Sequence, residues 1–295
     1  MGPAPSPPPA SDAPAAEWTA WRQAMRRADR AALRGRRGRH PALWRRGGLP
    51  DAAWWQAAGA AATGDKLLKQ GKSSRVVRLA APTGEAVILK HYLPTRRLDP
   101  RDGLGFSKAM RSLLAAEALE RRGFDVARPW ACWSRPGEGS WLLLEDLAET
   151  RPLHAEVLHH EGPARAALLA ALADTLRRLH RSGVAYRDLK PSNLMVGRDD
   201  DAPRFHFVDH DRNRFSSREV PRRIALRDLA AVHAGLPPAV RASERMAALR
   251  RYEPALAARP AWERDIPPVL AEAATRAHRW VPHGLLGAAC PLPRA

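Results

Sequence analysis

The apolar pattern of this 295-residue chain changes near Leu147, and no other feature constrains its fold as strongly. Between Lys66 and Leu147, short apolar runs alternate with turn residues such as glycine and proline, which is typical of β-strands. After Leu147, the leucines from Leu168 to Leu179 recur at helical spacing. The sequence therefore predicts an α+β protein in which a β-rich N-lobe precedes a helical C-lobe.

The N-lobe is predicted to contain five strands and one inserted helix. The helix begins after Ser107, a suitable N-cap residue, and ends near Gly123, because glycine commonly follows a helix C-terminus. The expected strands cover residues 66–74, 75–85, 86–92, 126–133 and 141–147. We place the N-lobe at residues 65–147 and the C-lobe at residues 148–295.

The first 64 residues divide into two segments of different composition. Residues 1–16 are mainly proline, alanine and serine, and we expect them to be disordered because they cannot offset the entropy cost of ordering. Residues 17–64 form a basic extension that is dense in arginine between Arg22 and Arg46. Three tryptophans are interleaved with these arginines: Trp18, Trp21 and Trp44.

The charge and cysteine content limit the partners and the compartment. Lysine and arginine number 49 against 31 acidic residues, and this net charge of +18 attracts anionic partners. No nucleic-acid-binding module is recognisable, so we expect no specific nucleic acid. A signal peptide pattern and an apolar run of about 18 residues are both lacking, which predicts a soluble or peripheral protein. Cys132 and Cys290 form no cysteine motif, which indicates a reducing, cytoplasmic location.

Residues Tyr186–Asn193, with the sequence YRDLKPSN, closely resemble the catalytic loop of kinases. In that loop, aspartate accepts the proton of the acceptor hydroxyl, and an asparagine five residues later ligates a magnesium ion. The resemblance assigns these roles to Asp188 and Asn193. It also assigns to Lys190 a contact with the transferred phosphate, where it would counter developing negative charge.

An apolar run beginning at Phe205 ends in Asp209, sixteen residues after Asn193. A magnesium ion that bridges phosphates needs an oxygen ligand fixed at a strand end, and the kinase resemblance places the metal-binding aspartate here. The sequence reads Asp209-His210-Asp211 in place of Asp-Phe-Gly. Asp211 is therefore an alternative ligand, although we favour Asp209 because it directly follows the strand.

Lys90 ends the apolar run AVILK, which resembles the kinase strand whose lysine holds the α- and β-phosphates of ATP. The partner of this lysine is expected on the helix that begins after Ser107. Glu117 lies on the apolar face of that helix, where a carboxylate needs a cation. Glu120 is the alternative partner of Lys90, and Arg121 is the alternative partner of Glu117.

Three further residues are expected to contact the nucleotide by their position. Gly71 and Ser73 lie in a hairpin turn whose backbone amides and hydroxyl would meet phosphate oxygens, although the turn contains no GxGxxG motif. Glu145 lies in the connector between the two lobes, where kinases bind adenine.

The segment after Asp209 is too short for the activation segment of a protein kinase. Asp228 follows after only nineteen residues, and no Ala-Pro-Glu motif occurs. The chain instead resembles the lipopolysaccharide core kinase family, bacterial enzymes that phosphorylate 3-deoxy-D-manno-octulosonic acid (Kdo) or heptose. The resembling segments lie between residues 65 and 235: VILKHY, the helix with Glu117 and the following GFDVARP, YRDLKPSN, VDHDRNR and RDLA.

This resemblance implies transfer of phosphate from ATP, with Mg²⁺, to a sugar hydroxyl of an anionic glycolipid at the cytoplasmic face of the inner membrane. It also implies that Asp228 supports the backbone of the catalytic loop. The basic extension would then contact anionic lipid, with its tryptophans at the interface. Four arginines of the C-terminal third suit an anionic acceptor. They are Arg241, Arg245, Arg250 and Arg251.

Other kinds of protein remain as alternatives to this prediction. A small-molecule kinase of the antibiotic or choline type has the same lobes and also lacks an activation segment. A protein kinase and a catalytically silent kinase-like scaffold are further alternatives. The sequence does not indicate an oligomeric state.

Overall fold

The computed structural model describes residues 7–10, 13–36, 43–44, 52–61, 67–71, 73–81, 83–94, 107–135, 137–199, 202–257 and 259–275. The contacts of the chain divide it into two compact units. The first unit comprises the described parts of Met25–Ala148 together with Asp209–Asp211. The second comprises the described parts of Ser6–Ala24, Glu149–Val208 and Arg212–Ala295. The first unit thus ends at Ala148, and the N-lobe was predicted to end at residue 147.

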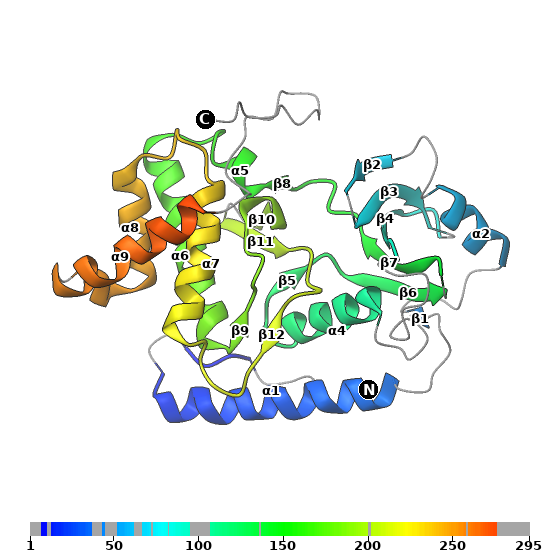
Figure 1. Ribbon diagram of the computed structural model, residues 1–295, viewed down its shortest axis with the longest axis horizontal. Helices are drawn as coiled ribbons and strands as arrows, with labels where there is room; N and C mark the ends of the chain where they lie inside the picture. The colour runs from blue at the N-terminus through cyan, green and yellow to red at the C-terminus, as the bar shows by residue number, and fades with distance from the viewer. Residues whose placement is uncertain are drawn as a thin grey trace. The chain divides into compact units, whose positions relative to one another are not determined.

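Six strands of the first unit form one antiparallel sheet in the order β1-β6-β7-β4-β3-β2 (Figure 1). They are β1 (Leu43–Trp44), β2 (Leu67–Gln70), β3 (Ser74–Ala80), β4 (Ala86–Tyr92), β6 (Pro129–Arg135) and β7 (Gly139–Glu145). β4 lies inside the sheet between β7 and β3, and it buries Val87 and Leu89 completely. Successive side chains of a strand alternate between faces, so Lys90 lies on the opposite face from these two residues. Its sheet partners are Leu142 and Val76.

Helix α4 (Lys108–Glu120) packs against β6 and β7 of this sheet. It begins as predicted, because the hydroxyl of Ser107 accepts a hydrogen bond of 3.2 Å from the backbone amide of Met110. The chain turns after the helix at Gly123, whose φ of +73° favours glycine. The short β5 (Asp125–Val126) follows.

The basic extension contributes to the first unit, which its composition did not predict. Helix α2 (Ala52–Ala61) packs against β3, and β1 pairs Leu43 with Cys132 at the edge of β6. An unpaired strand edge exposes backbone hydrogen-bonding groups, so pairing with β1 protects this edge of the sheet. Residues 17–64 are therefore partly integrated into the fold.

Helix α1 (Ala15–Arg36) begins inside the segment that was predicted to be disordered. The indole of Trp18 is 1% exposed and donates a hydrogen bond of 3.2 Å to the carbonyl of Ala10. Burial of this ring connects Ala10 to α1, and the disorder of residues 1–16 stays a prediction. Residues 1–6 and 11–12 lie outside the described residues.

The first turns of α1 also correct the predicted membrane contact. Trp21 is 7% exposed and meets Trp18 edge-on, with ring centroids 5.7 Å apart. Arg22 is buried and donates a hydrogen bond of 2.8 Å to the carbonyl of Arg181. The placement of Trp18 and Trp21 at a lipid interface is wrong, because both rings are buried inside the protein.

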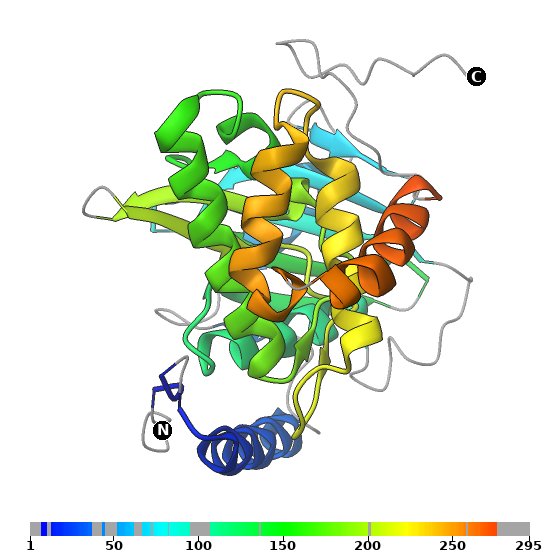
Figure 2. The same cartoon turned by 90° about the vertical axis from the view of Figure 1, so that its left-hand side faces the viewer.

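The second unit is mainly helical (Figure 2). Besides the part of α1 up to Ala24, its helices are α5 (Leu153–Glu156), α6 (Gly162–Arg181), α7 (Arg222–Gly235), α8 (Ala242–Tyr252) and α9 (Arg259–Ala274), with the 3₁₀ turns η1 (Pro191–Asn193) and η2 (Pro254–Ala257). α8 packs against α6, and α9 packs against α7. The leucines from Leu168 to Leu179 that predicted α6 are all buried.

Short antiparallel strands complete the second unit. β10 (Leu194–Asp199) pairs with β11 (Ala202–Phe207) on one side and with β8 (Arg151–Pro152) on the other. β9 (Val184–Ala185) pairs with β12 (Arg214–Phe215). η1 therefore lies directly before the hairpin that leads to Asp209. In the part of the chain that the structure describes, no helix combines the length and apolar character needed to cross a membrane.

Candidate active site

Lys90 and Asp209 form an ion pair inside the first unit. Nζ of Lys90 lies 2.7 Å from Oδ1 of Asp209, and the lysine side chain is only 12% exposed. The same nitrogen lies 4.8 Å from the centre of the Tyr92 ring. Two residues predicted to bind phosphate and metal are thus in contact although 119 positions separate them in the sequence.

The surroundings of Lys90 keep its ammonium group charged. Burial by itself would lower the pKa of Lys90, because a buried cation loses its hydration. Interactions with Tyr92 and with the carboxylates of Asp209 and Asp211 more than offset this effect, so the pKa lies above its ordinary value. Lys90 is therefore a permanent cation, as a group that holds phosphate oxygens must be.

The tripeptide Asp209-His210-Asp211 has an unusual backbone. Asp209 adopts a φ of +69°, a left-handed conformation that is costly for a residue other than glycine and is concentrated at functional sites. Burial lowers the pKa of His210 to about 3, so its imidazole is neutral at physiological pH. The hydrogen bond from Lys90 goes to Asp209, and the choice of Asp209 over Asp211 as the metal ligand stays a prediction.

Glu117 lies on α4 and is buried, with an exposed fraction of 6%. The alternatives to its pairing with Lys90 are engaged elsewhere. Glu120 lies 3.7 Å from Arg128, and Arg121 lies 2.9 Å from Asp29. The pairing of Lys90 with Glu117 stays a prediction.

The remaining nucleotide-contact predictions receive little support from local geometry. The amide of Gly71 donates to the carbonyl of Ser74 at 2.8 Å, and a side chain at position 71 would make only an ordinary contact with that oxygen. Ser73 is exposed. The carboxylate of Glu145, at the end of β7, accepts a long hydrogen bond of 3.4 Å from the amide of Arg128. The roles of these residues therefore stay predictions.

The catalytic-loop residues of the second unit converge on Asp188. Nζ of Lys190 lies 3.3 Å from its Oδ2, and Nδ2 of Asn193 donates to its carbonyl oxygen at 2.9 Å and to its Oδ2 at 3.4 Å. The carbonyl of Asn193 accepts a bond of 3.0 Å from the amide of Val208, the residue before Asp209. The loop therefore holds its carboxylate, cation and amide together, and its asparagine is tied to the strand that leads to Asp209.

The donor chemistry suits a magnesium ion. Both hydrogen bonds of the Asn193 side chain use Nδ2, which leaves its amide oxygen as the atom that would meet a cation. Asp209 supplies carboxylate oxygens, and oxygen ligands of this kind are those that Mg²⁺ prefers. Within the described residues, no group of three or more histidine, cysteine or acidic residues forms a dedicated metal cluster. A sparse set of ligands is expected for magnesium, which is typically bound by one or two carboxylates plus phosphates.

Asp228 holds the catalytic loop through its backbone. Its carboxylate accepts hydrogen bonds from the amides of Tyr186 at 2.9 Å and Arg187 at 3.0 Å, and its side chain is almost fully buried. Arg187 has a φ of +66°, so these bonds fix a strained peptide directly before Asp188. The hydroxyl of Tyr186 donates to the carbonyl of Val208. The structure thus agrees with the predicted supporting role of Asp228.

Three residues near the loop were not predicted from the sequence. Gly235, at the end of α7, lies so close to the loop that a Cβ atom there would approach Cδ of Pro191 to 2.5 Å. His180 and Tyr252 lie behind Asp228 and are buried. The only sequence signal for His180 is a polar residue among the apolar positions of α6, and Gly235 resembles an ordinary helix-terminating glycine.

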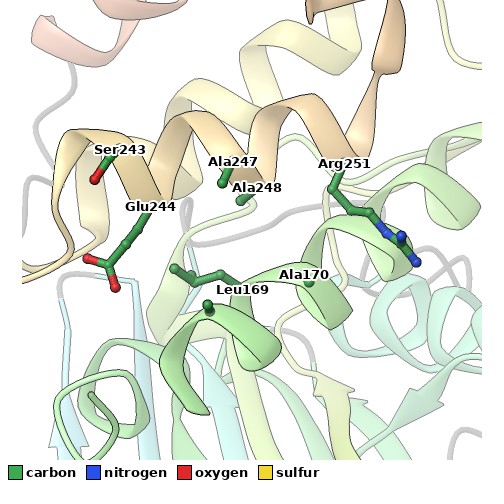
Figure 3. A pocket seen from close by; sticks show the side chains of 8 residues that line it. Leu169, Ala170, Ser243, Glu244, Ala247, Ala248 and Arg251 are labelled. Carbon is green, nitrogen blue, oxygen red and sulfur yellow. The ribbon is translucent and has the colours of Figure 1, made fainter. Parts of the chain in front are cut away.

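A hollow between α6 and α8 is separate from the loop residues, and alanines make up half of the residues that line it (Figure 3). Glu244 and Arg251 lie at its two ends, with Leu169 between them. Glu244 is paired with Arg165 at 2.8 Å, and Arg251 is paired with Asp174 at 2.8 Å. Because its charged side chains are committed to ion pairs, this hollow does not suit a phosphate group.

The C-terminal arginines are also less suited to an anionic acceptor than their sequence predicted. Arg245 donates to the carbonyls of His233, Leu236, Pro237 and Val240 at 2.7 to 3.1 Å, so it closes the end of α7. Arg251 is paired with Asp174, as described above. Arg241 and Arg250 are exposed and stay available for the predicted role.

Known proteins resemble this chain both in sequence and in fold. Residues 97–248 match the lipopolysaccharide kinase (Kdo/WaaP) family, which is 152 of the 295 residues. The fold is similar to a solved structure described as WaaP in complex with acyl carrier protein. The TM-score is 0.51, the identity is 22%, and the match covers 75% of this chain and 89% of that chain. This likeness confirms the predicted kinase-like fold class. No curated protein matches the chain.

Proposed function

Because the chain belongs to the lipopolysaccharide kinase (Kdo/WaaP) family, we propose that it phosphorylates a sugar hydroxyl of a lipopolysaccharide core or a related envelope glycolipid. Membership makes the chain a kinase, and ATP is the phosphoryl donor that this class implies. The observation that carries the proposal is the arrangement of Lys190 and Asn193 around Asp188, in a segment that the family match includes.

Asp188 is proposed to be the catalytic base. Its carboxylate orients the acceptor hydroxyl and takes its proton as the oxygen attacks the terminal phosphorus of ATP. The ammonium group of Lys190, which already lies against this carboxylate, counters negative charge on the transferred phosphoryl group. The strained Arg187 peptide, held by Asp228, fixes the direction of the base before the acceptor arrives.

Lys90, Asp209 and Asn193 are proposed to hold the nucleotide. Lys90 supplies a permanent positive charge for the α- and β-phosphates. Asp209 and Asn193 would hold Mg²⁺, which neutralises phosphate charge when bound. Because Lys90 pairs with Asp209 at 2.7 Å, the lysine also orients this carboxylate. Glu117, Gly71, Ser73 and Glu145 are proposed to complete the nucleotide contacts.

The acceptor and the setting are proposed by analogy with the family. A lipopolysaccharide core is anionic and is built at the cytoplasmic face of the inner membrane, where a chain with a net charge of +18 is attracted. We propose a peripheral contact through exposed arginines of α1, such as Arg27 and Arg30. The solved WaaP structure contains acyl carrier protein, which we propose as a protein partner to test by co-purification.

The test uses two variants that separate proton transfer from nucleotide binding. Full-length protein is incubated with labelled ATP, Mg²⁺ and deep-rough lipopolysaccharide, and label in the lipid is counted. The phosphotransfer rate of Asp188→Asn should fall by about 10²- to 10⁴-fold, while the variant should still bind Mg·ATP in a calorimetric titration. Asp209→Asn should lose both turnover and magnesium-dependent nucleotide affinity.

Two outcomes would contradict the proposal. Wild-type protein that labels no lipopolysaccharide but labels a free aminoglycoside or choline would reassign the acceptor. Loss of Mg·ATP binding in Asp188→Asn, with normal binding in Asp209→Asn, would reverse the two roles or move the metal to Asp211.

A further inference from the structure

Three buried side chains connect the end of α8 to the catalytic loop. The hydroxyl of Tyr252 lies 2.7 Å from Nδ1 of His180, and the ring edges meet at a centroid distance of 5.6 Å. Nε2 of His180 lies 3.4 Å from Oδ2 of Asp228. His180 and Asp228 are each 2% exposed, and Tyr252 is 9% exposed. All three belong to the second unit.

Asp228 is the point at which this connection reaches the loop. The same Oδ2 that faces His180 accepts the amide of Tyr186, while Oδ1 accepts the amide of Arg187. A carboxylate oxygen has more than one lone pair, so the Oδ2 that accepts from Tyr186 can also interact with a proton on Nε2 of His180. His180 therefore lies against the group that holds the strained peptide before Asp188.

We propose that Tyr252 and His180 are positioning residues of this kinase: the Tyr252 hydroxyl donates to Nδ1 of His180 and so places the ring proton on Nε2, facing Asp228. The hydrogen bond at one ring nitrogen of a neutral histidine fixes the proton on the other. In the opposite tautomer, the Nε2 lone pair would face the Asp228 carboxylate, which is repulsive. The proposal rests on the assignment of Asp188 as the catalytic base.

The environment of Tyr252 supports donation by its hydroxyl. Burial, followed by the nearby carboxylates of Glu253, Glu219 and Asp228, raises the pKa of Tyr252, so the phenol keeps its proton at all physiological pH values. The His180 to Asp228 separation of 3.4 Å is longer than a good hydrogen bond, so the Nε2–H dipole interacts with the carboxylate mainly by electrostatic attraction. Removal of the Tyr252 hydroxyl takes away the donor to Nδ1 and keeps the aromatic ring that packs against His180.

Tyr252→Phe tests the first step of this connection. We expect kcat for phosphorylation of deep-rough lipopolysaccharide to fall about tenfold, which corresponds to the net value of about one buried hydrogen bond. The KM for ATP should not change, because the nucleotide-holding residues are untouched. In ¹⁵N-histidine NMR spectra of the full chain, wild-type His180 should carry a proton on Nε2 and none on Nδ1, and the variant should show a larger share of rings with a proton on Nδ1.

A pair of His180 variants tests whether the hydrogen bonds or the packing matter. Glutamine can accept from Tyr252 through its oxygen and donate to Asp228 through its nitrogen, whereas leucine fills similar space and can do neither. His180→Gln should therefore keep more of kcat than His180→Leu. Arg251→Gln is the matched control, because it removes an exposed ion pair with Asp174 between the same two helices, one position before Tyr252, and should leave kcat unchanged.

Three results would overturn the inference. They are full kcat in a folded Tyr252→Phe protein, equal kcat in the two His180 variants, and a wild-type spectrum in which Nδ1 carries a proton, either in the neutral ring or in the imidazolium. Asp188→Asn, measured beside them, separates the two proposals. If Asp188→Asn is fully active, the assigned base is wrong, whereas an inactive Asp188→Asn with a fully active Tyr252→Phe contradicts only the positioning role.

Discussion

Asp29 of α1 neutralises a buried cation of the first unit, and its removal should strongly destabilise that unit. Oδ2 of Asp29 accepts from Arg122 at 2.8 Å, and Oδ1 accepts from Arg121 at 2.9 Å. The Arg122 side chain is 0% exposed, and the Asp29 side chain is 12% exposed. Asp29→Ala removes the carboxylate that faces Arg122 and leaves its hydrogen bond to the carbonyl of Ala118. Breaking a buried pair by removing one partner costs about 3–5 kcal/mol, because an uncompensated charge stays buried.

This cost is measurable as a shift in thermal unfolding. For a domain of this size, each 1 kcal/mol lowers the Tm by about 2–4 °C, so Asp29→Ala should lower it by roughly 6–20 °C. Circular dichroism and scanning calorimetry of the full chain measure the shift. Asp174→Ala is the matched control, because Asp174 holds Arg251 through two bonds of 2.8 and 2.9 Å at an exposed site. Water screens such a pair, so its Tm should change far less.

The double variant Asp29→Leu with Arg122→Met separates loss of charge compensation from loss of packing. Replacement of a buried ion pair by apolar residues of similar volume is often neutral or stabilising. The double variant should therefore recover most of the Tm that Asp29→Ala loses. Equal Tm shifts for Asp29→Ala and Asp174→Ala would refute the reasoning, because the burial of Arg122 would then make no difference.

Three further predictions concern other parts of the protein. Lys90→Met should stay folded, and its ATP turnover should fall by about 10²- to 10³-fold, because the cation proposed to hold the phosphates is removed. Phosphotransfer by the purified variant measures this loss. Gly235→Ala should lower both kcat and Tm, because its methyl group would overlap Pro191; an unchanged kcat would show that α7 can shift away from the loop. Burial, followed by Arg245, lowers the pKa of His233 below 6.5. The unfolded chain then binds more protons below about pH 6.5, so stability should fall as pH falls, and urea unfolding of His233→Asn should show a shallower decline.

The sequence predicted those parts of the fold and site that local patterns determine. Ser107 and Gly123 mark α4 because caps act on neighbouring backbone atoms. The spacing of Asp188, Lys190 and Asn193 within one loop was sufficient to predict that they meet. The pair of Lys90 and Asp209 was not predicted, since no local rule connects residues on distant strands. The kinase resemblance assigned both residues to the nucleotide site, and Glu117 was the expected partner of Lys90.

The parts that were mispredicted depend on contacts between distant segments. Trp18 and Arg22 look like a membrane-binding surface when composition alone is considered, since tryptophan and arginine are common at interfaces. Their side chains are instead buried, with Arg22 bonded to a carbonyl at the end of α6. Composition describes which chemistry a segment offers and leaves its partner undetermined.

The same limit explains why the sequence did not predict a role for His180 and Tyr252. Their chemistry depends on the relation of α6, α7 and α8, which no periodic pattern encodes. The strained φ of Arg187 is the structural observation that leads to them, because a costly backbone conformation persists only when its surroundings hold it. Asp228 provides that hold directly, and the two residues behind it determine how firmly its carboxylate is oriented. In this kinase, the residues proposed to position Asp188 therefore include Asp228 and, behind it, His180 and Tyr252.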